Sequence, residues 1–171
     1  MSWGDESMEV EKGFYFVKNN GQLQSPCEYA LIQADYQVHF YMKKVIFYLT
    51  KEPLVADRIV MKVSACPNVH LEVEKPVDLE EMKYEKLRYR NAGDGIDLEF
   101  SIEDGMLVQK MLVSGASSTD ELHLEFEGQK QLVLADKDAI RIEGVHESFQ
   151  FKCPSADSVI HGVKNSVEKE K

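Results

Sequence analysis

Alternation of apolar and polar residues with a period of two is the feature of this sequence that most constrains its fold. Over residues 121–127, leucine and phenylalanine alternate with glutamate and histidine, and the same period recurs over 96–102, 59–63 and 69–73. A period of two places successive side chains on opposite faces of a strand, so one face enters a core and the other meets water. The pattern predicts half-buried β-strands, with Leu122, Leu124 and Phe126 pointing inward.

Short apolar runs separated by turn residues extend this prediction along the chain. Further strands are predicted at 14–18, 36–42, 45–49, 106–113, 131–135, 140–143, 149–152 and 159–163. Glu103-Asp104-Gly105 and Glu127-Gly128-Gln129 have the residues typical of tight hairpin turns. About ten short strands with such turns predict an all-β fold, an antiparallel β-sandwich or jelly roll.

One short helix is also predicted, near Asp78–Leu87. Asp78 is a capping residue followed by acids in the first turn, and Leu79, Met82 and Leu87 share one side at helical spacing. We expect this helix to cover an open end of the sandwich.

The length and composition predict a single folded domain. The chain has 171 residues, of which 43% are hydrophobic and 29% charged, enough apolar material for one core. Charged ends predict a flexible N-terminus over 1–11 and a flexible charged tail over 165–171, with one β-sandwich domain over 12–164.

The net charge of the chain disfavours nucleic acid as a direct partner. Asp and Glu number 30 against 20 Lys and Arg, a formal net charge of -10, and the densest basic cluster, 83–90, is interrupted by Glu85. No run approaches the roughly 18 apolar residues of a membrane span. The odd, scattered cysteines Cys27, Cys66 and Cys153 and the lack of an apolar leader predict an intracellular protein, nuclear or cytoplasmic.

Motifs for catalysis, metals or cofactors are missing from the sequence. It has no nucleophile elbow, no phosphate-binding Gly-rich loop and no His-Glu-x-x-His, and its five histidines are not paired at zinc-ligand spacing. The stretch 91–95, Asn-Ala-Gly-Asp-Gly, lacks the ligand spacing of a calcium loop and predicts a turn. We therefore predict no catalytic residue, no metal and no cofactor, so the protein is not expected to be an enzyme.

Two surfaces are candidates for binding a protein. Carboxylates occupy the polar face of the predicted strands at 96–103 and 121–127. Rows of carboxylates on one face would create a negative field that attracts a basic partner. Solubility alone also explains an acidic surface. The predicted partner-binding residues are Asp97, Glu99, Glu103, Asp120, Glu121, Glu125 and Glu127. The stretch 38–49 is apolar on both faces, which predicts either core packing or an interface formed by Tyr41, Phe47 and Tyr48.

Part of the chain resembles the nucleoplasmin/nucleophosmin core, the fold of a family of histone chaperones. The resemblance rests on Leu-Glu-Phe-Ser-Ile-Glu-Asp (98–104), on Val-Ser-Gly-Ala-Ser-Ser-Thr-Asp-Glu-Leu-His-Leu-Glu-Phe-Glu (113–127) and on the closing segment 149–162. It covers about residues 95–165 and implies a jelly-roll protomer, a ring-shaped homo-oligomer and binding of basic proteins such as histones. Thr119 stands where the family usually has a basic residue, and the family's long acidic tract is absent.

These observations predict a non-enzymatic acidic β-sandwich protein that self-associates and binds basic protein partners. The alternative is an adaptor or assembly subunit whose aromatic N-terminal strands receive a peptide by strand addition. The two hypotheses differ in their sensitivity to salt, because only charge-driven capture weakens steeply as ionic strength rises.

Overall fold

The computed structural model of the chain is built from β-strands, and it describes residues 15–52, 55–63, 68–114, 124–154 and 167–169. No helix occurs in these ranges. The first seven strands are β1 (Phe16–Lys18), β2 (Tyr29–Ile32), β3 (Tyr36–Phe40), β4 (Lys44–Glu52), β5 (Val55–Lys62), β6 (His70–Asp78) and β7 (Lys83–Gly93). The remaining seven are β8 (Ile96–Glu103), β9 (Met106–Val113), β10 (Glu125–Glu127), β11 (Gln131–Asp136), β12 (Ala139–Glu143), β13 (Ser148–Lys152) and β14 (Val167–Lys169).

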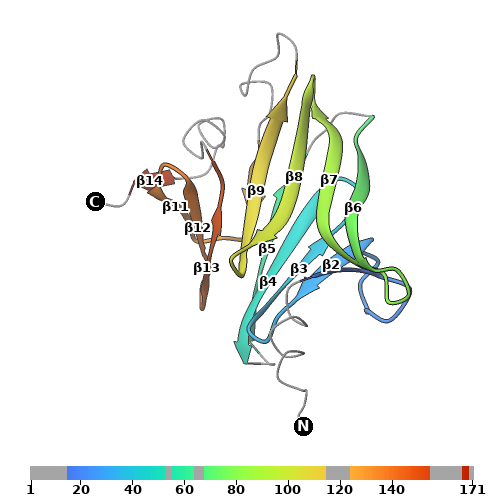
Figure 1. The fold of residues 1–171 in the computed structure, drawn as a ribbon. Coiled ribbons are helices and arrows are strands. Elements are labelled where there is room, and N and C mark those ends of the chain that lie inside the picture. The colour runs from blue at the N-terminus through green and yellow to red at the C-terminus, as the bar shows by residue number, and fades with distance from the viewer. Residues whose placement is uncertain (1–14, 53–54, 64–67, 115–123, 155–166, 170–171) are drawn as a thin grey trace.

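All fourteen strands belong to one curled, mixed sheet (Figure 1). Its order is β10-β5-β4-β3-β2-β1-β7-β8-β9-β13-β12-β11-β14, with β6 paired to β7 beside this path. Most neighbours are antiparallel, whereas β13 runs parallel to β9 and β14 runs parallel to β11. The all-β prediction is confirmed.

Aromatic rings fill the space inside the curl. The ring of Phe40 on β3 lies 5.2 Å from that of Phe100 on β8, and Phe47 on β4 stacks on Phe151 of β13 at 5.9 Å. All four rings are fully buried. Strands far apart in the sheet order therefore face one another across a common core, and burial of large apolar surfaces stabilises the curl.

The predicted register of the strand at 121–127 is confirmed where the structure describes it. Leu124 and Phe126 are buried, Glu125 is half-buried and Glu127 is exposed. Leu122 lies outside the described residues. Phe126 pairs with Met61 of β5, so β10 adds its apolar face to the same core.

The helix predicted near Asp78–Leu87 is wrong, because this segment is the turn between β6 and β7 and the first half of β7. The Asp78 carboxylate accepts a hydrogen bond from the Glu81 amide at 3.1 Å, and Met82 adopts a φ of 55°. An Asp that binds an amide three residues later supports a turn as well as a helix N-terminus. The pairing of β6 with β7 then decides in favour of the hairpin.

Of the two predicted hairpin turns, one is confirmed and one is wrong. Asp104 and Gly105 have φ angles of 53° and 73° and connect the paired strands β8 and β9. The 127–129 turn instead connects β10, which pairs with β5, to β11, which pairs with β12. Gly128 is needed there, because a Cβ would lie 2.3 Å from the Arg58 carbonyl oxygen and the φ is +98°.

The structure describes only some of the residues for which the two ends of the chain gave predictions. Val167–Lys169 forms β14 against β11, within the stretch that the sequence predicts as a flexible tail. The strand predicted at 159–163 and the N-terminus 1–11 lie outside the described residues. Among the residues that are described, no helix is long and apolar enough to cross a membrane.

Candidate functional site

The outer face of β6, β7, β8 and β9 carries charged side chains in rows that alternate in sign. Period-two spacing puts every second residue of each strand on this face. The register pairs Glu72 with Arg88 and Arg88 with Glu99, and then Glu99 with Lys110. The rows are Glu72 and Glu74 on β6; Lys86, Arg88 and Arg90 on β7; Asp97, Glu99 and Glu103 on β8; and Lys110 on β9.

Glu99 lies at the centre of this charged face and is buried. Its carboxylate lies 3.5 Å from Lys86 Nζ and 3.5 Å from Arg88 Nη2, and its side chain is only 8% exposed. Glu99 faces outward as predicted, but its carboxylate is not exposed, and its role in binding a partner stays a prediction. The two basic side chains of β7 cover the carboxylate.

The other two predicted acids of β8 also have cationic neighbours. Asp97 lies 3.5 Å from Arg90 Nη1 and accepts the Asn91 amide at 3.0 Å, with 21% of its side chain exposed. Glu103 is 45% exposed, and its carboxylate lies 3.1 Å from Lys110 Nζ. Glu103 is thus the most accessible of the three.

The carboxylates of β10 form a separate, open group. Glu127 is 59% exposed and pairs with Lys62 of β5 at 2.8 Å, an interaction that raises the pKa of Lys62. Glu125 lies opposite Lys62 in the register. Asp120 and Glu121 lie outside the described residues.

Of the three predicted interface aromatics, two are accessible and one is not. Tyr41 and Tyr48 are half-buried. Phe47 is fully buried between Phe149 and Phe151, so its prediction as an interface residue is wrong: its side chain takes the inward parity of β4.

His39 lies next to Tyr48 on the outer face of the sheet and is 6% exposed. Its ring contacts the Ser25 hydroxyl at Nδ1 (2.8 Å) and the Gln37 side-chain oxygen at Nε2 (2.9 Å). Burial lowers the pKa of His39, since the charged imidazolium loses its hydration. The residues near Ser25 therefore cover part of this face.

Asp57 on β5 is a buried carboxylate to which no motif in the sequence points. It accepts the backbone amides of Val145 (3.1 Å), His146 (2.8 Å) and Glu147 (2.7 Å), in the loop between β12 and β13. Gly144 permits this approach, because a Cβ there would lie 2.7 Å from the carboxylate. One feature of the sequence could have indicated this buried carboxylate. Asp57 is two residues before Ile59 and four before Met61, so the three side chains share the face of the strand that points into the core.

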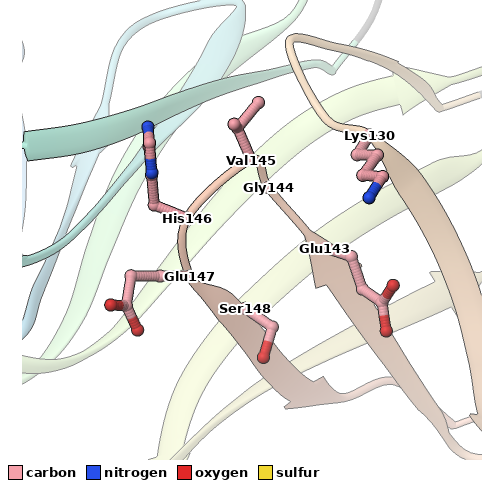
Figure 2. Close-up of a pocket in the computed structure, with 7 residues that line it drawn as sticks. All are labelled: Lys130, Glu143, Gly144, Val145, His146, Glu147 and Ser148. Carbon is pink, nitrogen blue, oxygen red and sulfur yellow. The ribbon is translucent and has the colours of Figure 1, made fainter.

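A polar hollow of about 270 Å³ opens beside this loop. Figure 2 shows Lys130 and Glu143 on one side of it and His146 and Glu147 on the other. His146 and Lys130 are exposed, and Glu143 and Glu147 are half-buried. The hollow is an open surface depression whose shape follows from the anchoring of the loop by Asp57.

The other motifs considered in the sequence have structural roles. Gly95 adopts a φ of 73° in the connection from β7 to β8, so the turn predicted over 91–95 is confirmed at Asp94 and Gly95, whereas Asn91, with a φ of 60°, still belongs to β7. Burial raises the pKa of the Cys153 thiol to about 12, and this thiol accepts a long contact from Gln109.

His123 lies outside the described residues. The described residues contain no cluster of His, Cys, Asp or Glu able to hold a metal ion.

A family model described as "Domain of unknown function (DUF7948)" matches residues 80–170, from the turn before β7 to β14. The matched residues make up more than half of the chain. The chain belongs to this family. No curated protein and no solved structure matches the sequence. The matched part includes the basic row of β7 and the acidic row of β8. The acidic row of β6 lies before the matched residues.

Proposed function

We propose that this chain is a non-enzymatic protein-binding module that associates with itself and binds a basic partner protein. The observation that carries the proposal is the set of exposed carboxylates on β8 and β10. Glu103 and Glu127 are 45% and 59% exposed, and they pair with Lys110 and Lys62, whose side chains are 39% and 52% exposed.

The lysine in an exposed ion pair of this kind is readily replaced by another cation. An exposed ion pair contributes about 0–1 kcal/mol, so a cation from a partner can replace the resident lysine at little cost. One group of carboxylates gives a weak, screened attraction. Several copies in one assembly raise the effective concentration of the sites, and avidity increases without any new contact.

The architecture and the family resemblance are consistent with this proposal. Contacts between β3 and β8 across the core support assignment of the curled sheet to the β-sandwich or jelly-roll class. The resemblance of residues 95–165 to the nucleoplasmin/nucleophosmin core would add a ring-shaped assembly and histones as the basic partner. We include both as parts of the proposal.

Binding to core histones at increasing salt concentration tests the proposal. We expect the wild-type chain to bind at low ionic strength and to lose affinity steeply as salt is added. The triple substitution Glu103→Lys, Glu125→Lys and Glu127→Lys should weaken binding strongly while leaving the oligomer mass and Tm nearly unchanged.

A matched control reverses three exposed carboxylates elsewhere, with Asp35→Lys, Glu80→Lys and Glu85→Lys. This control makes the same change in net charge and should retain more of the binding. A wild-type chain that is strictly monomeric, or that binds no basic protein in a salt-sensitive way, would contradict the proposal.

A second candidate function is that of an adaptor that holds a peptide on its N-terminal strands. It is favoured by the partly exposed apolar and aromatic residues there: Tyr41 and Tyr48 are half-buried, and Ile32 and Met42 are 38% and 43% exposed. Binding through this surface would persist at high salt, which distinguishes it from capture by carboxylates.

A further inference from the structure

The outer edge of β6 is unpaired in the described part of the chain. β6 pairs with β7 along one side and with no other described strand. At one end of this edge Lys75 adopts a φ of 56° and Pro76 lacks an amide hydrogen, features that protect an edge from further pairing. The segment His70–Glu74 has neither feature and keeps its register with β7.

The rows of alternating charge stop at this edge. The carboxylate row of β8, inside the sheet, has basic residues on both sides, as Glu99 has Arg88 and Lys110 in the register. The β6 row has cationic residues of a neighbouring strand on one side only. Glu74 depends on Arg88 at 3.8 Å, and its side chain is 34% exposed.

Glu72 is held more closely and still faces the open side. It accepts Arg90 Nε at 3.0 Å and contacts His70 Nε2 at 2.9 Å, and these two bonds lower the pKa of Glu72. Its side chain remains 39% exposed. Both carboxylates of this row are therefore accessible to a strand placed beside β6.

The opposite face of the same segment is apolar. Leu71 and Val73 are half-buried and pack against the core. A strand added beside β6 would place alternate side chains next to these two residues and the others next to Glu72 and Glu74, because its side chains also alternate between the faces.

We propose that the edge of β6 at residues 70–74 receives an extended segment of a partner protein in which Lys or Arg alternates with apolar residues. Backbone hydrogen bonds to the open edge would supply affinity, and the alternation would supply specificity. This inference rests on the proposed function, since it adds a strand-binding site on β6 to the carboxylates of β8 and β10 for the same basic partner.

A set of short peptides tests the inference on the full chain. We expect a peptide of alternating lysine and valine to bind and to slow amide hydrogen exchange within residues 70–74. A shuffled peptide with its lysines grouped together should bind more weakly, because it cannot match both faces of β6.

N-methylation of the alternating peptide separates strand addition from simple charge attraction. Alternate amides of a strand point to opposite sides, so methylating one set blocks the hydrogen bonds to β6 and methylating the other set does not. One of the two methylated peptides should lose binding and the other should keep it. Equal binding by both would overturn the inference.

Variants of the chain provide a second test. Glu72→Gln with Glu74→Gln should weaken binding of the alternating peptide by on the order of tenfold, as loss of close charge pairs does at an interface. The matched control, Asp35→Asn with Glu80→Gln, makes the same change in net charge at exposed sites and should bind like wild type. A similar loss in both variants would also overturn the inference.

The remaining outcomes separate this inference from the proposed function. If the chain binds histones in a salt-sensitive way but not the alternating peptide, the β6 inference fails and the proposed function stands. If neither binds, both fail. Protection of residues 70–74 that grows with the concentration of the chain alone would show that a second copy occupies the edge, which contradicts the partner proposed.

Discussion

His39 is a polar residue on the outer face of the sheet that the fold nevertheless buries. The neutral imidazole donates to the Gln37 oxygen from Nε2 and accepts the Ser25 hydroxyl at Nδ1. A protonated ring could still donate from Nδ1 to the Ser25 hydroxyl oxygen, so the cost of protonation is the lost hydration of the buried positive charge. The structure is therefore built for the neutral form.

We predict that His39 makes stability depend on pH. Its pKa is lowered in the folded state from 6.5, so below that pH the unfolded chain binds more protons and the free energy of unfolding falls. Above pH 6.5 this contribution is fully present. Urea unfolding of wild type and His39→Gln at a series of pH values would measure it. An identical pH dependence in the two proteins would contradict the prediction.

Among the elements, β10 is a strand whose two faces differ sharply in their environment. Phe126 is 1% exposed in the core, whereas Glu125 is half-buried beside Lys62. A shift of one residue in register would exchange the two environments, and it would bury a carboxylate without a partner. The alternation along the strand therefore specifies its register.

This difference predicts unequal costs for two neighbouring substitutions. Phe126→Ala should lower the free energy of unfolding by about 3–5 kcal/mol, through lost apolar burial and a residual cavity. Glu125→Ala should lower it by less than about 0.5 kcal/mol. Denaturant unfolding compares them directly. Equal losses would mean that the register of β10 in solution differs from this structure.

On the scale of the whole molecule, Asp57 ties together strands that lie far apart in the sheet order. It belongs to β5, near one end of the sheet, and binds amides of the loop between β12 and β13, up to 90 residues away in the chain. These bonds fasten the curled sheet across its open side. Strand pairing alone does not bring these segments together.

Removal of this carboxylate should loosen the curl. We predict that Asp57→Ala lowers the free energy of unfolding by about 2–4 kcal/mol, because three partly buried amides lose a charged acceptor. The loop 144–147 should also exchange its amide hydrogens faster. Asp35→Ala, at an exposed turn, is the control and should have little effect. A stable Asp57→Ala variant with an unchanged loop would refute this role.

The net negative charge of the chain does not show how its charged residues are arranged on the surface. The face of β6–β9 interleaves carboxylates with Lys86, Arg88, Arg90 and Lys110, so much of its charge is neutralised within the sheet. The period-two spacing of the three basic residues on β7 was visible in the sequence. Which strand they would lie beside was not.

Local patterns in the sequence determined the all-β class, the inward parity of Leu124 and Phe126, and the turn at Asp104 and Gly105. Each depends on residues close together in the chain, whose side-chain directions follow from strand geometry. The tertiary structure alone decided the hairpin at 79–82, the connection at Gly128, the burial of Glu99 and Phe47, and the role of Asp57. In each of these cases the environment is made by a strand distant in sequence, so long-range pairing overrides the local preference.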